Sequence, residues 1–433
     1  MQIFQSLLRT LLPVSGLILI VFSLFISGSG ASEIRLEGSG DKISRSYFGM
    51  HIHRADTTTP WPIARFGTWR LWDAAVSWER LEPAQDSWDF KRLDTLVALA
   101  ERHGIEPMLT LGITPRWAAS RPNEKFVYGY GGNSPPRDMR DWEDYVRTVT
   151  TRYKGRIQYY ELWNEPTFDE IDKGRGFYAG SVKTMVELGR IAHRVIKEID
   201  PNNKLISPGF TDQGGRLDLY LSNGGKSITD VVAHHCYPQK PERITACLDF
   251  VRGVMTKHGI DGLPLWNTET GFWLPLAGET PNPNWPKNQN ELSGYIARTL
   301  ILGAVSGLDR FYWYSWETTM LGGNPKSLQA SPSIVAYMQT MRWLDGASIN
   351  HCFSKDHSLW ICELQRGPRR ANLVWNSRES VMWVPPLDWN AIQFETLDAR
   401  SVQIKSGEAL SIGQVPVLVK RDHQFWTTTQ TRP

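Results

Sequence analysis

Between residues 44 and 345, short apolar runs alternate with longer segments in which apolar residues recur every three or four positions. The short runs predict buried strands, and the longer spacing predicts amphipathic helices. One helical stripe lies within 141–153, and a second, over 185–199, ends before Pro201. This alternation predicts repeated strand–helix units that share a parallel sheet.

Eight apolar runs fit the strands of such a sheet, which predicts an α/β protein with a (β/α)8 TIM barrel. The runs are 47–53, 67–73, 105–112, 157–164, 204–210, 231–238, 263–269 and 310–316. In this barrel the loops that follow the strands form the catalytic face. The loops after the third, fourth, seventh and eighth runs are long and rich in Gly, Pro and aromatic residues, so we expect them to build a binding site.

The pattern changes after residue 345, where short alternating runs are broken by Gly, Pro and Asn. Such runs predict a small C-terminal all-β domain. We therefore expect the catalytic barrel over 32–345 and a small β-sandwich-like domain over 346–433.

The first 31 residues have a different character from the rest of the chain. No charged residue occurs between Arg9 and Glu33, and a dense apolar segment over 17–26 is followed by small residues. This pattern is typical of a secretory signal peptide or of a membrane anchor that contacts the bilayer through residues 10–30. Both alternatives place the protein outside the cytoplasm, either periplasmic or secreted, or anchored in the inner membrane.

The net charge of +3 is too small to suggest a nucleic-acid partner. The chain also has 19 Trp, 14 Tyr and 16 Phe, more aromatic rings than a core requires. Part of them must pack the core, and exposed ring faces suit sugar ligands.

Four cysteines lie in the predicted extracytoplasmic part of the chain, where disulfides form. They allow three pairings, of which the local pairs Cys236 with Cys247 and Cys352 with Cys362 are the simplest. Buried free thiols are the alternative. The spacings match no zinc motif.

Two carboxylates end strands of the predicted barrel. Glu165 follows the fourth run and Glu269 ends the seventh, so both point into the same mouth. A pair of carboxylates across one cleft is what glycosidic bond cleavage requires. Aromatic neighbours of Glu165 predict a raised pKa and a protonated acid, whereas Glu269 must stay ionised and needs hydrogen-bond donors, for which Arg70 and Tyr237 are the candidates.

The motifs "ELWNEP" and "WNTETG", together with the stretch 77–118, resemble those of the retaining barrel glycosidases whose catalytic glutamates follow strands 4 and 7. The chain is most similar to glycoside hydrolase family 39, and within it to membrane-associated glycosidases of bacterial exopolysaccharide systems. The resemblance implies Glu165 as acid/base, Glu269 as nucleophile and Asn164 as the partner of the sugar 2-hydroxyl. It also implies a β-linked polysaccharide or oligosaccharide substrate, an exopolysaccharide export system as a partner, and no cofactor.

Each of these assignments has a structural alternative. Glu279 is a local rival for the nucleophile, and Asn164 can instead cap its loop through backbone hydrogen bonds. The further candidates for substrate binding or nucleophile support are Arg70, His53, His235, Tyr237, Trp316, Trp117 and Trp273, each of which can also be an ordinary packed residue.

The histidines suggest a second class of enzyme. "HIH" in the first run and "HH" in the sixth are similar to metal-dependent amidohydrolases, but the histidine expected after the fifth strand and the aspartate expected after the eighth are missing. We therefore expect no metal. A membrane-tethered glycan-binding pseudoenzyme is a further alternative, although such proteins normally lose one of the two acids.

We also expect the enzyme to cut inside a polysaccharide. The long loops carry aromatic rings that can form several stacking subsites: Trp117, Tyr128, Tyr130, Phe168, Phe177, Trp273 and Trp285. If these loops instead fold over the site, they close it into the pocket of an exo-acting, β-xylosidase-like enzyme.

Overall fold

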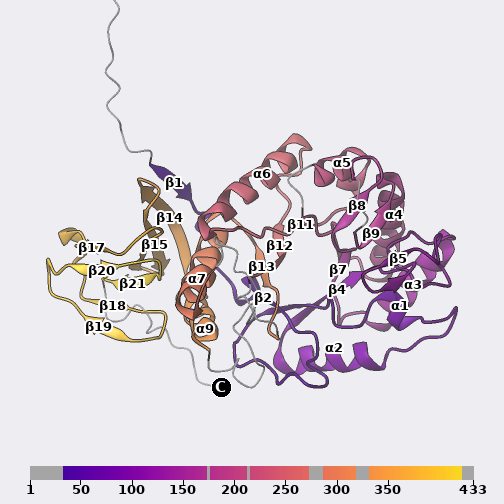
Figure 1. Cartoon of the computed structure of the whole chain (residues 1–433), viewed down its shortest axis with the longest axis horizontal. Helices are drawn as coiled ribbons and strands as arrows, with labels where there is room; N and C mark the ends of the chain where they lie inside the picture. Colours follow the sequence, from indigo (N-terminus) through magenta and orange to yellow (C-terminus); the bar gives the residue numbers. More distant parts are fainter. Residues whose placement is uncertain (1–32, 173–175, 212–214, 273–285, 318–330, 422–433) are drawn as a thin grey trace, which may run out of the picture.

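The computed structural model describes residues 33–172, 176–211, 215–272, 286–317 and 331–421. Eight parallel strands form the barrel, in the order β10-β7-β4-β3-β2-β13-β12-β11 (Figure 1). Their bounds are β2 (Phe48–His51), β3 (Thr68–Arg70), β4 (Glu106–Leu111), β7 (Tyr159–Leu162), β10 (Lys204–Ile206), β11 (Val232–His234), β12 (Leu265–Thr270) and β13 (Arg310–Trp313). Parallel bridges from Ile206 to Val231 and from Phe210 to His234 join the two ends of this sheet. The predicted barrel is confirmed: seven of the predicted runs each contain one strand, and the run 263–269 overlaps β12, which extends one residue further, to Thr270.

Helices cover the outside of the barrel. They are α1 (Trp78–Leu81), α2 (Lys91–His103), α3 (Met139–Arg152), α4 (Val182–Ile199), α5 (Arg216–Ser222), α6 (Ile244–Lys257), α7 (Gln289–Val305) and α9 (Pro332–Leu344). Of these, α2, α3, α4 and α6 each bury one apolar face, whereas α7 is buried on nearly all sides. In α3 the predicted stripe is buried, and the Asp138 carboxylate caps the helix by accepting from the Arg140 peptide N–H. The helix α4 begins after Ser181, which caps it in the same way, and ends before Pro201.

Much of the indole content belongs to the core. Nine tryptophans are among the largest fully buried side chains, and Trp78 stacks on Tyr145 with ring centroids 4.9 Å apart. The aromatic composition is therefore in large part a packing feature, and only particular rings are available to a ligand.

The C-terminal part is an antiparallel sheet with the order β1-β14-β15-β16-β21-β18-β19. Its strands are β14 (Ser348–Lys355), β15 (Leu359–Arg366), β16 (Arg369–Asn376), β18 (Gln393–Glu395), β19 (Ser401–Gln403) and β21 (Val417–Lys420), with β17 (Val381–Trp383) and β20 (Leu410–Ile412) as a separate pair. The additional β1 (Ile34–Glu37) pairs with β14, although these residues lie in the range that the sequence pattern assigned to the barrel. A four-residue strand carries too little pattern to reveal its partner.

Both local disulfides form. One links Cys236 after β11 to Cys247 on α6, and the other joins Cys352 and Cys362, which are paired across β14 and β15. The alternative of buried free thiols is therefore wrong.

Helices α7 and α9 lie between the barrel and the C-terminal sheet (Figure 1). The Glu395 carboxylate on β18 accepts hydrogen bonds from Gln339 and Trp343 on α9. Glu242, just before α6, likewise accepts from Arg298 on α7 and from Trp375 on β16. These hydrogen bonds, buried at Glu395 and part-buried at Glu242, fix the small domain on the barrel.

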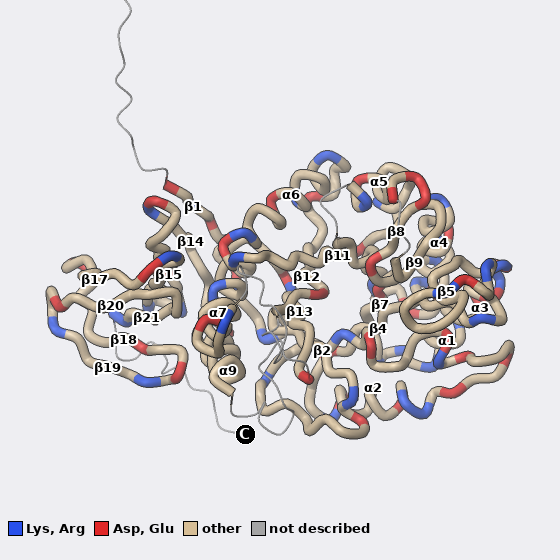
Figure 2. The backbone as a smooth tube through the Cα atoms, in the orientation of Figure 1, with Lys and Arg blue, Asp and Glu red and all other residues tan. Residues whose placement is uncertain are grey.

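Basic and acidic residues are interspersed along the described chain (Figure 2), in keeping with the small net charge. Within the described ranges, no helix has the length and apolar content needed to cross a bilayer. The segment 1–31, predicted to be a signal peptide or anchor, lies outside the described residues, as does the rival nucleophile Glu279.

Candidate active site

Glu165 and Glu269 meet at the mouth of the barrel. Glu165 follows β7 and Glu269 lies in β12. One carboxylate oxygen of each, together with a ring nitrogen of His235, lies within 4.8 Å of the others. The two strand ends thus bring the two acids to one point, as the order of strands predicts.

The backbone around Glu165 is strained. Trp163 and Glu165 have φ values of 69° and 40°, in the left-handed region that non-glycine residues rarely adopt. The Glu165 peptide N–H donates to the carbonyl of Gly209 at 2.9 Å, and the Trp163 indole donates to the carbonyl of Phe177 at 2.9 Å. Strain of this kind costs about 1–3 kcal/mol per residue and persists only where surrounding contacts enforce it. This turn, closed by Pro166, ends the strand at the acid.

A single buried guanidinium organises the polar groups below the mouth. Arg70 on β3 donates to Glu161 Oε2 from Nε at 2.8 Å and from Nη2 at 2.6 Å. Its Nη1 donates to Glu269 Oε2 at 2.8 Å, and its Nη2 also donates to Asn164 Oδ1 at 2.7 Å. Arg70 therefore fixes the positions of Glu269 and Asn164 together.

Glu269 has a second partner on the opposite side. Its Oε1 accepts a hydrogen bond from the Tyr237 hydroxyl at 2.7 Å. Burial raises the pKa of Glu269, while the Arg70 guanidinium and the Tyr237 hydroxyl act in the opposite direction by stabilising the carboxylate. Both donors proposed from the sequence thus contact Glu269.

Glu165 has a different environment. Its side chain is 24% exposed, and burial raises its pKa to about 7, with Arg70 and Arg216 opposing that rise and Asp73 adding to it. His235 Nδ1 lies 2.8 Å from Glu165 Oε1, and its Nε2 lies 3.1 Å from Thr268 Oγ1. Burial lowers the pKa of His235 to about 4, so the imidazole is neutral at pH 7.

The remaining predicted residues are not all at the mouth. His53 is partly buried, and its peptide N–H donates to Glu317 Oε1 at 2.7 Å. Trp316 is 2% exposed within the core, so it has no free ring face for a sugar. Trp117 is half-buried and donates to the Glu82 carbonyl at 2.9 Å. Trp273 lies outside the described residues.

Several site residues were missed in the sequence. Glu161 is fully buried and accepts from Thr110 as well as Arg70. The sequence did carry a sign of this role, because Glu161 is a charged residue within an apolar strand run, and a buried charge needs a buried partner. Asp73 was also missed, although it ends the second predicted run; its carboxylate accepts from the hydroxyls of Tyr314, at 2.7 Å, and Tyr128.

Two cavities adjoin this cluster on opposite sides. The first, about 140 Å³, is lined by residues that include Trp72, Asp73, Thr110 and Tyr128, from the side of β3 and β4. The second, about 740 Å³, is lined by residues that include His235 and Tyr237 and extends along α6. The first cavity thus lies beside β3 and β4, and the second lies beside α6.

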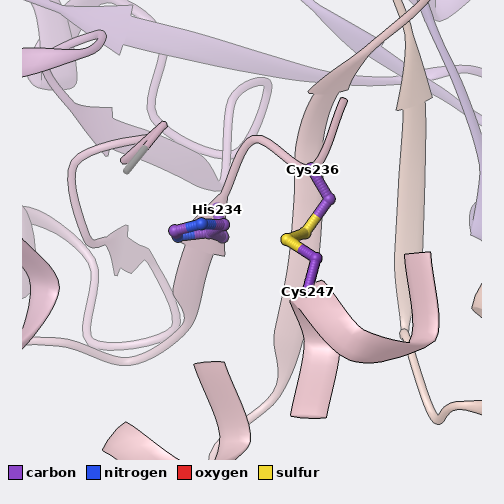
Figure 3. Close-up of side chains that lie close together, drawn as sticks. All are labelled: His234, Cys236 and Cys247. Atoms are coloured by element: carbon purple, nitrogen blue, oxygen red, sulfur yellow. A yellow bond between two sulfur atoms is a disulfide. The ribbon is translucent and has the colours of Figure 1, made fainter. Parts of the chain in front are cut away.

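Among the histidines at the barrel mouth, His235 lies in a group with Glu165 and Glu269 whose ligand atoms could hold a metal ion. His234 lies beside Cys236 and Cys247 (Figure 3), but the two sulfurs are bonded to each other and are not thiolate ligands. Among the described residues, His51 and His53 belong to no cluster of potential metal ligands, which disfavours the His-x-His metal site of the amidohydrolase alternative.

Comparisons with known proteins agree with this geometry. The model of Glycosyl hydrolases family 39 matches residues 64–258. A beta-xylosidase from Geobacillus stearothermophilus is 24% identical over 256 residues, which are 52% of this chain and 48% of that enzyme. The match therefore spans about half the length of this relative.

Solved structures share the fold at low identity. A family 39 glycoside hydrolase from Bacteroides cellulosilyticus WH2 superposes with a TM-score of 0.65 at 16% identity, covering 88% of this chain and 82% of that one. A GH39 beta-xylosidase from Caulobacter crescentus superposes with a TM-score of 0.61 at 17% identity, covering 89% and 97%.

Proposed function

This chain belongs to glycosyl hydrolase family 39, and from that premise we propose that it hydrolyses glycosidic bonds with retention of anomeric configuration. The observation that carries the proposal is the approach of Glu165 and Glu269 to within 4.8 Å. Retaining enzymes hold their carboxyl groups roughly 5–5.5 Å apart, whereas inverting enzymes leave about 6.5–9.5 Å for a water molecule.

The two acids have complementary roles in this double displacement. Glu269, as a carboxylate, attacks the anomeric carbon while Glu165 donates its proton to the departing glycosidic oxygen. The bond from that oxygen to the anomeric carbon breaks, and a covalent ester forms at Glu269. Glu165, now ionised, removes a proton from a water molecule, which attacks the same carbon and releases Glu269.

The surrounding residues support these roles. Arg70 and Tyr237 favour the ionised form of Glu269, as a nucleophile requires. The raised pKa of Glu165 favours its protonated form, as the acid requires. We assign the sugar 2-hydroxyl to Asn164, a role that the hydrogen bond from Arg70 to its Oδ1 supports by fixing the side chain.

Proton NMR of the first product tests this assignment. The product is expected to keep the anomeric configuration of its substrate, and early release of the opposite anomer would refute double displacement. A 2-fluoro sugar inactivator is expected to label the peptide that contains Glu269, and labelling of Glu165 instead would reverse the roles.

The mode of cleavage is a further part of the proposal: the enzyme is endo-acting on a bacterial exopolysaccharide. Cavities on both sides of the catalytic pair support an open groove, as do the exposed rings of Tyr128 and Tyr130 on the loop before α3. Phe168 does not contribute, because it is fully buried, and Trp285 lies outside the described residues.

The alternative is exo action, which the beta-xylosidase name of the curated relative favours. Product size over time on an exopolysaccharide separates the two modes. Oligosaccharides of several units at the first time points support endo action, and monosaccharide alone overturns it. A second assay separates an enzyme of either mode from a glycan-binding pseudoenzyme. An enzyme hydrolyses an aryl glycoside as the wild type and loses this activity in the Glu165→Gln, Glu269→Gln double variant, whereas a pseudoenzyme does not hydrolyse it at all.

We further propose that the protein works outside the cytoplasm, in the periplasm or secreted, or held at the inner membrane by residues 10–30, where an exported polymer is accessible. The apolar segment at the start of the sequence supports this. Fractionation of cells that express the full chain tests the proposal, and recovery in the cytoplasm would refute it.

A further inference from the structure

We infer that the cavity along α6 binds the leaving-group side of a glycan chain, with Phe250 as the platform on which a sugar ring beyond the scissile bond stacks. This inference rests on the proposed function, because it assigns the occupant of a cavity that adjoins the proposed catalytic pair.

The cavity adjoins the proposed catalytic centre. It is lined by His235, which contacts Glu165, and by Tyr237, which contacts Glu269. From there it extends over the Cys236–Cys247 disulfide to Arg243 and Phe250 at the rim. Its volume of about 740 Å³ lies within the range of roughly 300–1,000 Å³ that small-molecule sites have.

The hydrogen bonds of the two acids indicate which part of the substrate lies on this side. Glu269 Oε2 faces Arg70, whose guanidinium also holds Asn164, while Glu269 Oε1 faces Tyr237. The 2-hydroxyl belongs to the sugar that forms the covalent intermediate, so Asn164 places that sugar toward β3 and β4. The leaving group then extends the other way, past His235 and toward α6.

Phe250 does not follow the packing pattern of its helix. The buried stripe of α6 includes Ile244, Leu248, Val251 and Met255, and Phe250 lies off this stripe with 39% of its surface exposed. An aromatic ring in that position adds nothing to the core, but offers an apolar face of the kind on which sugar rings stack. A second hollow on α6 also includes Phe250, together with Gly253 and Lys257, so the ring stands between two depressions.

Arg243 adds polar contacts to this surface. Its side chain is exposed at the rim, and among the described residues no carboxylate pairs with its guanidinium. Its five N–H donors can therefore bind the hydroxyls of a bound sugar. The disulfide fixes α6 against the end of β11, and thus holds Phe250 at a set distance from Tyr237.

The test compares substrates with and without sugars on the leaving side. The probes are the 4-nitrophenyl β-glycoside that the wild type hydrolyses fastest in a panel of sugars, and the β-linked hexasaccharide of that sugar, ¹⁸O-labelled at its reducing end. Phe250→Ala is expected to lower kcat/KM for the hexasaccharide about tenfold, equivalent to about 1.4 kcal/mol, and to lower it by less than about threefold for the aryl glycoside. Cleavage should also shift toward the labelled end, because fewer leaving-side sugars then contribute to binding.

Two further variants control for folding and for ring loss in general. Phe250→Trp retains a stacking surface and should restore the hexasaccharide cleavage pattern. Met382→Ala removes a side chain that is 69% exposed on the C-terminal domain, and should leave both substrates unaffected. Equal losses on both substrates in Phe250→Ala, or an unchanged cleavage pattern, would overturn the inference. A wild type that cleaves no glycoside of the panel would instead refute the proposed function, and the inference with it.

Discussion

The pH dependence of activity should report the unusual protonation of Glu165. The proposed mechanism needs this carboxyl protonated in the first step, and burial raises its pKa to about 7. We therefore expect kcat/KM for a substrate with a poor leaving group to be level between the pKa of Glu269, below which the nucleophile is protonated, and the pKa of Glu165. Above it, kcat/KM should fall tenfold per pH unit, since kcat/KM follows the ionisation of the free enzyme.

The magnitude follows from the same shift. A rise of the pKa from 4.5 to about 7 corresponds to about 3 kcal/mol at about 1.4 kcal/mol per pH unit. Between these pH values, the folded protein keeps a proton that the unfolded chain has lost, so this carboxyl lowers the free energy of unfolding as pH rises. The Glu165→Gln variant has no titratable group at this position. Its stability relative to the wild type should therefore improve by up to about 3 kcal/mol between pH 4.5 and pH 8.

Two measurements test the prediction. Urea unfolding at pH 4.5 and pH 8 gives the difference in stability between the variant and the wild type. Initial rates between pH 4 and 9, on substrates with activated and with poor leaving groups, give the fall of kcat/KM at alkaline pH, which we call the alkaline limb. In Glu165→Gln the limb near pH 7 should vanish, with losses of roughly 10²–10⁴ on poor leaving groups and much smaller ones on activated groups. If the alkaline limb persists in the variant, or if the stabilities of variant and wild type change with pH in parallel, a group other than Glu165 titrates.

Three other substitutions test the supports of the site. Arg70→Met should abolish activity and lower the free energy of unfolding in urea by about 3–5 kcal/mol, because it leaves the buried carboxylates of Glu161 and Glu269 without their cation. A decrease below about 1 kcal/mol would contradict this. Gly209→Ala places a Cβ 2.3 Å from His235 Nε2, so kcat/KM should fall at least tenfold. Gly262→Ala, whose Cβ would have no atom within 4 Å, should leave kcat/KM unchanged in the same assay. Cys352→Ala should lower the unfolding free energy by about 2–4 kcal/mol and leave kcat/KM unaltered, and a large loss of activity would show that the small domain acts on the site.

Local pattern was sufficient for the barrel. Each strand run and helix stripe depends on whether residues two, three or four positions apart share a face, which is a property of the chain itself. The order of strands then placed Glu165 and Glu269 at one mouth, since parallel strands in a barrel end on the same side. The cysteine pairs were also accessible, because they are close in sequence.

Tertiary structure alone decided which other residues join these two acids. His235 and Trp316 both lie at the end of a predicted strand, yet His235 contacts Glu165 whereas Trp316 is buried in the core. No spacing in the sequence distinguishes these two positions. Glu161 came to share the Arg70 guanidinium with Glu269 because β3, β7 and β12 converge inside one ring. Burial, and with it the pKa of Glu165, depends on how many distant segments close over a side chain, which packing in three dimensions determines.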